Sequence, residues 1–320
     1  MSCVSEPSAV YGVDIGKAEI TVCRDGHEAV QAKANQMRAL SCWLRELPAG
    51  ALLVMEATNT YHELLATLAA AQGLQVVVLD PRRSWHYARA IGQRGKADGP
   101  DARLLARYGA HEWRKLRPWR PPTEGNARLA KLLARRAKLM RAKVALGQSL
   151  STVAELRALC AQTQRALQRM IERLDLLIVK AAQAAEFAPL HRLLQSIVGV
   201  GPLVAAQLAQ ALTRMPWERC ESFIAHTGLD PRPQDSGKHR GRRRITKHGP
   251  PMLRHLLYLA AMSASKTTLW KPVYKALRDR GLESTEALVV LARRIARIAF
   301  AISRSGQPFD PKFLKQAGAA

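Results

Sequence analysis

A long stretch with few helix breakers divides this chain of 320 residues into three parts. Residues 123–186 are rich in Ala, Leu, Arg, Lys and Gln and contain few β-branched residues. Their helical periodicity predicts two long helices, which we expect to form a coiled-coil arm. The arm would separate an N-terminal domain at 8–115 from a C-terminal domain at 187–310, in line with the two or three compact units expected for this length.

Strand patterns and helical patterns alternate in the N-terminal region. The pair Asp25-Gly26 is a strong hairpin signal between the second and third strands. Three antiparallel strands followed by alternating helices and strands predict an α/β fold of the ribonuclease H (RuvC-like) kind. The C-terminal region is predicted to be mostly α-helical, with a polar interruption at 228–251. In the N-terminal region we expect strands at 9–15, 19–24, 28–34, 51–55 and 74–79, and helices at 36–47, 59–72 and near 99–109.

The charge balance points to a polyanionic partner. The chain has 50 Lys and Arg residues against 25 acidic ones, a formal net charge of +25. Phosphate contacts release counterions and dominate the affinity of basic proteins for nucleic acid. The sequence shows no signal peptide and no apolar stretch long enough for a membrane span, so we expect a bacterial cytoplasmic protein, nucleoid-associated when acting, without a membrane partner. The five scattered cysteines form no CxxC pair and predict neither zinc nor disulfides.

Four acidic residues are candidate metal ligands. Asp14 lies inside the first strand pattern and Glu56 ends the fourth, and these strands are neighbours in a ribonuclease H sheet. Asp98 and Asp101 are three residues apart, so a helix beginning there would place them on one face. Clustered carboxylates repel one another unless a cation intervenes, and hard oxygen ligands suit Mg²⁺. Such ions can stabilise the attacking and leaving oxygens of a phosphodiester.

Each acid also has a structural alternative. Glu56 could cap the next helix together with Thr58, and Asp98 and Asp101 could be a helix N-cap and the acid three positions on. For that pair, capping and metal binding are about equally favoured when the residues are taken alone. The alternative for Asp14 is weak, because an acid in an apolar strand is costly to bury without a partner. Together with the topology, the pattern favours a metal site.

Two loops in the C-terminal region are candidate nucleic-acid contacts. Ser236 precedes Gly237 in a cationic loop, where it is either a nucleophile or an ordinary turn residue, and spacing alone favours the turn. Gly199 and Gly201 lie in a segment that looks like a helix-hairpin-helix motif able to hold a phosphate, although a plain turn is nearly as well supported. The predicted nucleic-acid contacts are Lys17, Arg128, Arg135, Arg136, Gly199, Gly201, Lys238, Arg240, Arg242, Arg243, Arg244 and Lys247.

An ordered set of motifs resembles a known family. GVDIGK at 12–17, MEAT at 55–58 and KADGPDA at 96–102 resemble the DEDD transposases of the IS one-ten insertion-sequence family. GLDP at 228–231, Ser236-Gly237 and ITKHG at 245–249 resemble the second conserved domain of that family. No single motif is decisive, but the likeness runs in order along nearly the whole chain.

The resemblance implies an activity and its parts. Asp14, Glu56, Asp98 and Asp101 would bind Mg²⁺, and Ser236 would be the covalent nucleophile of an RNA-guided transposase or recombinase. The partners would be donor and target DNA, a structured non-coding bridge RNA, and further copies of the chain in a dimer or tetramer, in which the carboxylates of one subunit and the serine of another can act together. Two departures concern local geometry. Where the family usually has Thr-Asp-x-x-Asp, Ala97 precedes Asp98 and Pro100 lies between the two acids. Pro250-Pro251 follow Gly249, where the family often has Asn.

Two other functions remain as alternatives. A RuvC-type junction-resolving endonuclease would use metal-activated water and form no covalent link to DNA. A non-catalytic scaffold would bind nucleic acid without cutting it, and chelation of Mg²⁺ would change its binding little. A tyrosine recombinase is disfavoured, because the chain has no convincing Arg…His-x-x-Arg…Tyr pattern.

Overall fold

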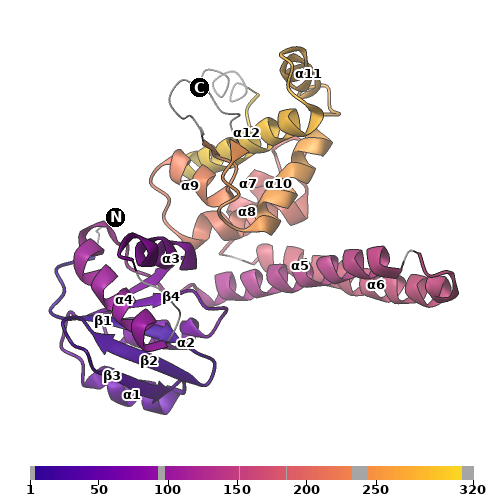
Figure 1. Ribbon diagram of the computed structural model, residues 1–320. Coiled ribbons are helices and arrows are strands. Elements are labelled where there is room, and N and C mark those ends of the chain that lie inside the picture. The colour runs from indigo at the N-terminus through magenta and orange to yellow at the C-terminus, as the bar shows by residue number, and fades with distance from the viewer. Residues whose placement is uncertain (1–3, 93–97, 151, 185, 233–243, 312–320) are drawn as a thin grey trace. The chain divides into compact units, whose positions relative to one another are not determined.

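The computed structural model describes residues 4–92, 98–150, 152–184, 186–232 and 244–311, with the side chain of Asp98 outside the description. The chain divides into two compact units, Met1–Pro121 and Pro122–Ala320 (Figure 1). This division falls between the predicted ends of the first domain and the arm, at 115 and 123. The predicted boundary at 186/187 stays a prediction. None of the helices that the structure describes combines the length and apolarity that a membrane span needs.

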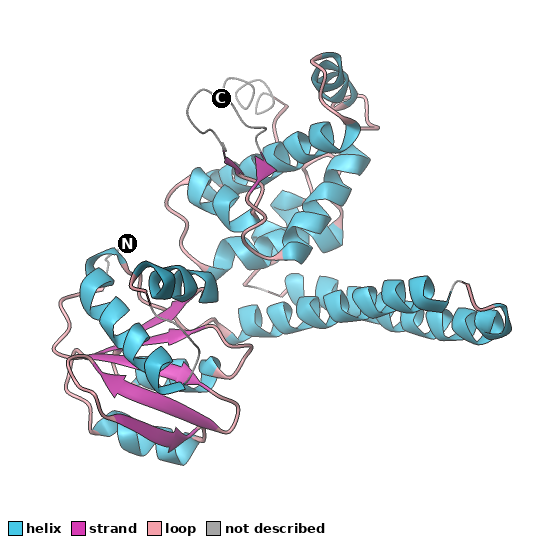
Figure 2. Ribbon diagram, viewed as in Figure 1, coloured by secondary structure: helices cyan, strands magenta, loops and turns pink. Residues whose placement is uncertain are grey.

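The N-terminal unit is built on a mixed five-stranded sheet with helices on both faces (Figure 2). Its strand order is β3-β2-β1-β4-β5, in which β1, β4 and β5 are parallel and β2 and β3 are antiparallel neighbours. The predicted adjacency of the first and fourth strands is confirmed, and the order is consistent with a ribonuclease H-like fold. The strands are β1 (Val10–Ile15), β2 (Glu19–Arg24), β3 (Val30–Ala34), β4 (Leu52–Glu56) and β5 (Gln75–Leu79).

Alternation along the strands gives the sheet two buried faces. On one face Val13, Ile15 and Met55 pack against α1 (Met37–Arg45) and α2 (His62–Ala71). On the other face Val10, Val54 and Val77 pack against α4 (Asp98–Glu112). Residues of even number on β1 and β4, including Asp14 and Glu56, therefore share the face that α4 covers.

A glycine on β1 allows α4 to lie directly on the strand. A Cβ atom at Gly12 would stand 2.0 Å from the carbonyl oxygen of Ala102 and 2.2 Å from the amide nitrogen of Ala106. Further along α4, a Cβ at Gly109 would meet Val54 at 2.6 Å and Val10 at 2.8 Å. The helix thus crosses the sheet in contact with β1 and β4, and its first turns lie on the side of Asp14.

The structure contains one helix that the sequence pattern did not predict. The basic segment after β5 forms α3 (Pro81–Ala90), with Pro81 at the first position and the Asp80 carboxylate accepting a hydrogen bond from the Arg82 amide at 2.8 Å. Both features are helix-start signals. They were missed because the helix is strongly basic and buries few residues, so it lacks apolar periodicity. The short 3₁₀ helix η1 (Trp113–Lys115) follows α4.

The second unit begins with the two long helices that the composition predicted. They are α5 (Glu124–Leu150) and α6 (Arg157–Ala182), joined through the 3₁₀ helix η2 (Ala154–Leu156), and they pack against each other. Coiled-coil packing of the pair stays a prediction. Leu129 and Leu133 of α5 and Ile178 of α6 belong to the same hydrophobic core as the helices that follow. The base of the arm is therefore continuous with the C-terminal helical core.

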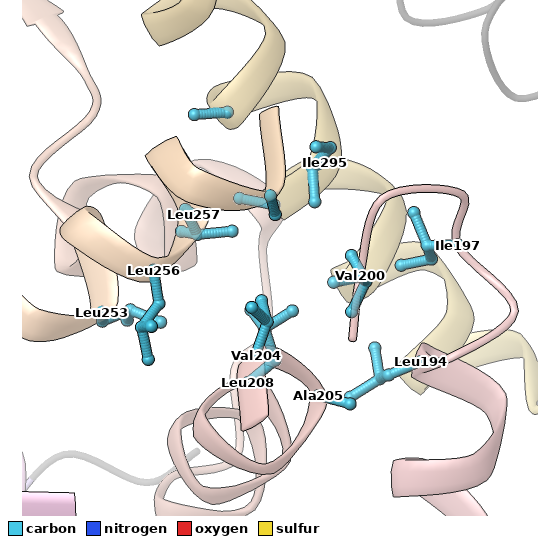
Figure 3. Close-up of a cluster of buried hydrophobic side chains, with 14 of the residues drawn as sticks. Leu194, Ile197, Val200, Val204, Ala205, Leu208, Leu253, Leu256, Leu257 and Ile295 are labelled. Atoms are coloured by element: carbon cyan, nitrogen blue, oxygen red, sulfur yellow. The ribbon is translucent and has the colours of Figure 1, made fainter. Parts of the chain in front are cut away.

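The rest of the second unit is helical apart from one short ladder. Its core is lined by aliphatic side chains from several helices and from the turn at 195–201, with Ile197, Val200, Val204 and Leu257 facing a common centre (Figure 3). Inside the polar interruption, β6 (Pro231–Arg232) and β7 (Arg244–Ile245) pair as an antiparallel two-stranded ladder. The helices are α7 (Ala188–Leu194), α8 (Pro202–Arg214), α9 (Cys220–Thr227), α10 (Pro251–Ala264), α11 (Lys271–Asp279) and α12 (Ser284–Ser305).

Candidate active site

The strand register brings two of the predicted acids to adjacent positions. Gly12 pairs with Val54 and Val13 with Met55 in the parallel β1–β4 ladder, so Asp14 and Glu56 are the next residues on the two strands. Both side chains are half-buried on the face that α4 covers. The parallel strands end here, and the carboxyl end of such a sheet is where ligands usually bind.

The other two acids lie in the first turn of α4. That helix begins at Asp98, and Asp101 is half-buried on it. Arg103 holds the start of α4 to the β2–β3 hairpin by donating to the Glu28 carbonyl oxygen at 2.8 Å. The first turn of α4 thus lies over the same face of the sheet as Asp14 and Glu56. The side-chain direction of Asp98 falls outside the description.

Glu56 has a partner that the sequence reasoning missed. The hydroxyl of Ser84, buried on α3, donates a hydrogen bond to the Glu56 carboxylate and also lies 3.0 Å from the Pro81 carbonyl oxygen. The capping alternative for Glu56 is not observed, since α2 begins only at His62. The start signals at Asp80 and Pro81 could have located α3, but no local pattern marks Ser84 as the residue that reaches Glu56.

The donor set has the chemistry of a divalent-cation site. Asp14, Glu56 and Asp101 supply only carboxylate oxygens, the ligands that Mg²⁺ and similar hard ions prefer. Within the described residues, no group of three or more His, Cys, Asp or Glu side chains is already gathered as a metal cluster. A metal cluster that includes the side chain of Asp98 would fall outside the described residues. Asp14, Glu56 and Asp101 fit a divalent ion in their chemistry, but the structure does not gather these three side chains into a ready cluster, and ligation by all four acids stays a prediction.

The predicted serine loop is closed at its base by backbone pairing. The Thr246 amide donates to the Asp230 carbonyl at 3.0 Å, and the Thr246 hydroxyl donates to the Asp230 carboxylate. The Lys247 amide donates to the Gly228 carbonyl at 3.1 Å. Both arms of the loop are thus held together on the helical core. Ser236, Lys238, Arg240, Arg242 and Arg243 lie outside the described residues, between these arms.

Two glycines allow this base to form. Gly228 has φ 70° and a Cβ there would meet the His248 carbonyl oxygen at 2.2 Å. Gly249 has φ 104° and a Cβ there would meet the His226 carbonyl oxygen at 1.8 Å. Only glycine combines these left-handed conformations with such close backbone contact. The two family-like motifs, GLDP and ITKHG, therefore pack against each other through their glycines.

The glycine-rich turn before α8 has two different glycines. Gly199, at φ 98°, is pressed against α10, where its Cβ would meet Ala264 at 2.6 Å and the Ala260 carbonyl at 2.8 Å. Gly201 is exposed at the N-cap of α8, with nothing within 4 Å of a Cβ there. The close approach explains Gly199 by packing, whereas Gly201 stays available to a phosphate. A helix-hairpin-helix function stays a prediction.

The predicted cations differ in their surroundings. Arg136 forms an ion pair with Asp175 that joins α5 to α6, and its side chain is only 12% exposed. Arg128 and Arg135 are exposed on α5, and Lys131 and Lys138 share their face at helical spacing. Lys17, Arg244 and Lys247 are exposed on turns and on β7. The exposed face of α5 is therefore the better phosphate surface, and Arg136 acts within the helix pair.

Comparison with known proteins supports the same assignment. Residues 11–156 match the DEDD transposase family model of IS110 elements, and residues 191–275 match the model described as "Transposase IS116/IS110/IS902 family". A pilin gene-inverting protein of Moraxella bovis is 27% identical over 94% of this chain and 97% of its own length. Its counterpart from Moraxella lacunata is 26% identical over the same shares. An uncharacterized 44.8 kDa protein of insertion element IS116 from Streptomyces clavuligerus is 29% identical over 37% of this chain and 30% of its own.

An acid-bearing α/β unit joined to a helical transposase domain defines a DNA transposase or recombinase. The chain belongs to the IS110 (IS one-ten) family of insertion-sequence transposases. It is thus an enzyme that acts on DNA, and the DEDD model suggests use of a divalent metal ion.

Proposed function

We propose that this transposase is an RNA-guided recombinase that cuts and rejoins DNA through a phosphoserine intermediate. The observation that supports it best is the placement of Asp14 and Glu56 at adjacent positions on neighbouring strands, beneath the helix that bears Asp98 and Asp101. A structural acid would need no such convergence. The alternative enzyme, a RuvC-type nuclease, shares the carboxylates but not the serine.

Asp14, Glu56, Asp98 and Asp101 are proposed to hold the divalent ion, with Mg²⁺ the expected one. When bound, the ion would stabilise negative charge on the phosphodiester undergoing cleavage. Ser84 would orient Glu56 by its hydrogen bond, leaving the second carboxylate oxygen for a ligand. Asp14, Glu56 and Asp101 are half-buried, which would limit the access of bulk water to a bound ion.

Ser236 is proposed as the nucleophile. The serine oxygen would attack phosphorus, and a P–O bond of the DNA strand would break. The proton lost by the serine hydroxyl would end on the departing DNA oxygen. The resulting phosphoserine conserves the ester, so the reverse step can join a different strand. The loop cations Lys238, Arg240 and Arg242 would stabilise the developing phosphorane charge. The closed base at Asp230 and Thr246 supports this proposal, because it holds both arms of the loop on a rigid core.

The named activity of the relatives favours recombination over hydrolysis. Inverting a gene requires that both cut ends be rejoined, and the Moraxella relatives are named for that outcome. Cleavage by water would hydrolyse the phosphodiester, so its bond energy would not be available for rejoining the strands. A covalent intermediate therefore fits inversion better than a RuvC-type mechanism does.

The bridge RNA and the multimer belong to the same proposal. The exposed cations of α5 at 128, 131, 135 and 138 supply a row of phosphate contacts. Pairing of RNA with DNA would read the target, so the side chains need not carry sequence specificity. Sequencing of RNA that copurifies with the protein tests this part. An enriched RNA encoded beside the gene is expected, and only bulk cellular RNA would contradict it.

The decisive experiment looks for a covalent protein–DNA adduct. The full element is expressed in bacteria with a target plasmid, and recombination joints and denaturation-resistant adducts are measured for the parent and two variants. Asp14→Asn should abolish cleavage, and Ser236→Ala should abolish both adduct and joints while RNA and DNA assembly persists. Normal turnover by Asp14→Asn would refute the metal site. Cleavage by Ser236→Ala, with the adduct retained, would make the serine a turn residue and favour the RuvC-type nuclease.

A salt titration of nucleic-acid binding tests whether the positive charge of the chain serves to bind phosphates. Binding should fall steeply with salt concentration, with a log–log slope set by the number of phosphates neutralised. Replacing exposed Arg135 by Ala should lower that slope by about one, whereas paired Arg136 should change it less. A flat titration would contradict the polyanion interpretation.

A further inference from the structure

We propose that the outer face of α3 holds an unpaired nucleotide of the DNA strand being cut, with its base stacked on Trp85. The face is formed by Arg82, Trp85 and Arg89, which share one side of the helix at spacings of three and four. This inference rests on the proposed function, because it assigns a DNA contact beside the proposed metal site.

The exposure of Trp85 has no explanation in the packing of the N-terminal unit. Its side chain is 48% exposed, although tryptophan normally contributes a large buried area. Tyr87 and Trp113 pack against the core beneath α4, but Trp85 does not. Its ring contacts are with polar side chains: the guanidinium carbon of Arg89 stands 4.9 Å from the ring centroid, and the His86 ring meets the indole edge-on with the centroids 4.8 Å apart. The indole is thus held by its own helix and offers its remaining surface to solvent.

The charge around Trp85 is complementary to nucleic acid. Helix α3 contains Arg82, Arg83 and Arg89 and has no acidic residue between its first and last positions. All three arginines are exposed, and in the described part of the chain no carboxylate forms an ion pair with them. An aromatic ring between cations is the arrangement by which single strands are bound, with bases stacked on the ring and phosphates beside it.

The position of α3 beside Glu56 indicates which nucleotide Trp85 would bind. Ser84, the neighbour of Trp85, is the residue that donates to the Glu56 carboxylate. Glu56 pairs with Leu79, two residues before α3 begins at Pro81. A base on Trp85 would therefore belong to a nucleotide close to the phosphodiester held at the carboxylates. Strands that are cut and exchanged lose their pairing there, which frees a base to stack.

Photo-crosslinking of the full-length protein tests the contact directly. The probes are a single-stranded DNA of about 20 nucleotides carrying 5-iododeoxyuridine and an RNA of the same sequence carrying 5-iodouridine, mixed in equal amounts. We expect a DNA adduct on Trp85, mapped by mass spectrometry, in excess of the RNA adduct. Adducts that avoid Trp85 would overturn the proposal. An RNA adduct on Trp85 equal to or above the DNA adduct would overturn the assignment to DNA.

Affinity measurements at raised salt give an independent readout, because stacking persists where phosphate contacts fade. Trp85→Ala should weaken single-stranded DNA binding about tenfold and leave duplex binding unchanged, while Trp85→Tyr should stay within about twofold of the parent. The matched control is Met37→Ala, which truncates an exposed apolar side chain on α1, on the other face of the sheet. Equal effects of Trp85→Ala and Met37→Ala would contradict a stacking site.

The crosslink also separates this inference from the proposed function. Asp14→Asn should lose recombination but keep the Trp85 adduct. If Asp14→Asn is inactive and no adduct forms on Trp85, the inference fails while the metal site stands. If Asp14→Asn recombines normally, the metal site fails whatever the crosslink shows.

Discussion

The two units hold their motif residues in different ways. In the N-terminal unit, Asp14 and Glu56 lie on adjacent buried strands, and their relation is set by the register of a five-stranded sheet. In the second unit, a loop leaves a helical core through a ladder of only two residues a side. The sheet places side chains from distant parts of the chain, whereas the ladder determines only where the loop starts and ends. The sheet register therefore places the acids, whereas glycine-mediated packing places only the base of the loop.

The largest expected effect comes from filling the contact between β1 and α4. Gly12→Val would drive a side chain into the backbone of Ala102 and Ala106 and should destabilise the N-terminal unit by more than about 4 kcal/mol. Hydrogen exchange measured by mass spectrometry should show loss of protection confined to residues before 122. Gly26→Ala is the matched control, because its φ is 77° with open space around the Cβ, and about 1 kcal/mol is expected. Equal effects of the two changes would contradict close packing at Gly12.

The next effect tests the loop base of the second unit. Gly249→Ala would place a Cβ against the His226 carbonyl oxygen and shift the C-terminal arm of the loop base. Recombination should fall about 100-fold, as expected when reacting groups are displaced by about an ångström, while the helical core stays folded. Gly281→Ala, at φ 85° and with nothing nearby, provides the control in the same unit and should leave recombination nearly unchanged. Loss of activity in both variants alike would point to backbone strain in general.

A smaller effect is expected from the residue that orients Glu56. Ser84→Ala removes the hydrogen bond to the carboxylate without a large change in volume. The Mg²⁺ concentration for half-maximal recombination should rise about tenfold, since partners of metal ligands commonly contribute that much to affinity. Ser41→Ala on α1, on the opposite face of the sheet, should leave that concentration unchanged. A drop in activity that excess Mg²⁺ does not relieve would argue against a positioning role.

The smallest effect concerns pH and is shared by the units. Burial lowers the pKa of His62 in the N-terminal unit and of His226 in the second unit below the ordinary value of 6.5. The unfolded chain then takes up protons first as pH falls, so the stability contributed by each neutral imidazole is lost below about pH 6.5. Thermal melts at pH 7.5 and 5.5 should show this loss. His226→Gln should flatten the pH dependence of the second unit alone, and an unchanged profile would contradict the burial effect.

Periodicity and turn signals were sufficient for most of the framework. The apolar runs of β1 and β4, the alternation at β2 and β3 and the Asp25-Gly26 turn predicted the strands, and the breaker-poor stretch predicted α5 and α6. Helix α3 was missed because its residues bury little and carry no apolar stripe. Arg136 was predicted as a phosphate contact because charge and spacing cannot tell that Asp175, 39 residues further on, lies opposite it.

The sequence by itself determined which residues could do the chemistry: an acid in an apolar strand, an acid at a strand end and a serine among cations. These are local choices, and each carries a physical cost or preference that a linear pattern reveals. The tertiary structure decided which of them meet. The parallel register of β1 and β4 brings Asp14 beside Glu56, Ser84 reaches Glu56 from a helix 28 residues away, and the glycines at 228 and 249 hold two motifs together. Such contacts require segments that are far apart in the sequence to lie within a few ångströms of each other in space. No local propensity encodes that closeness.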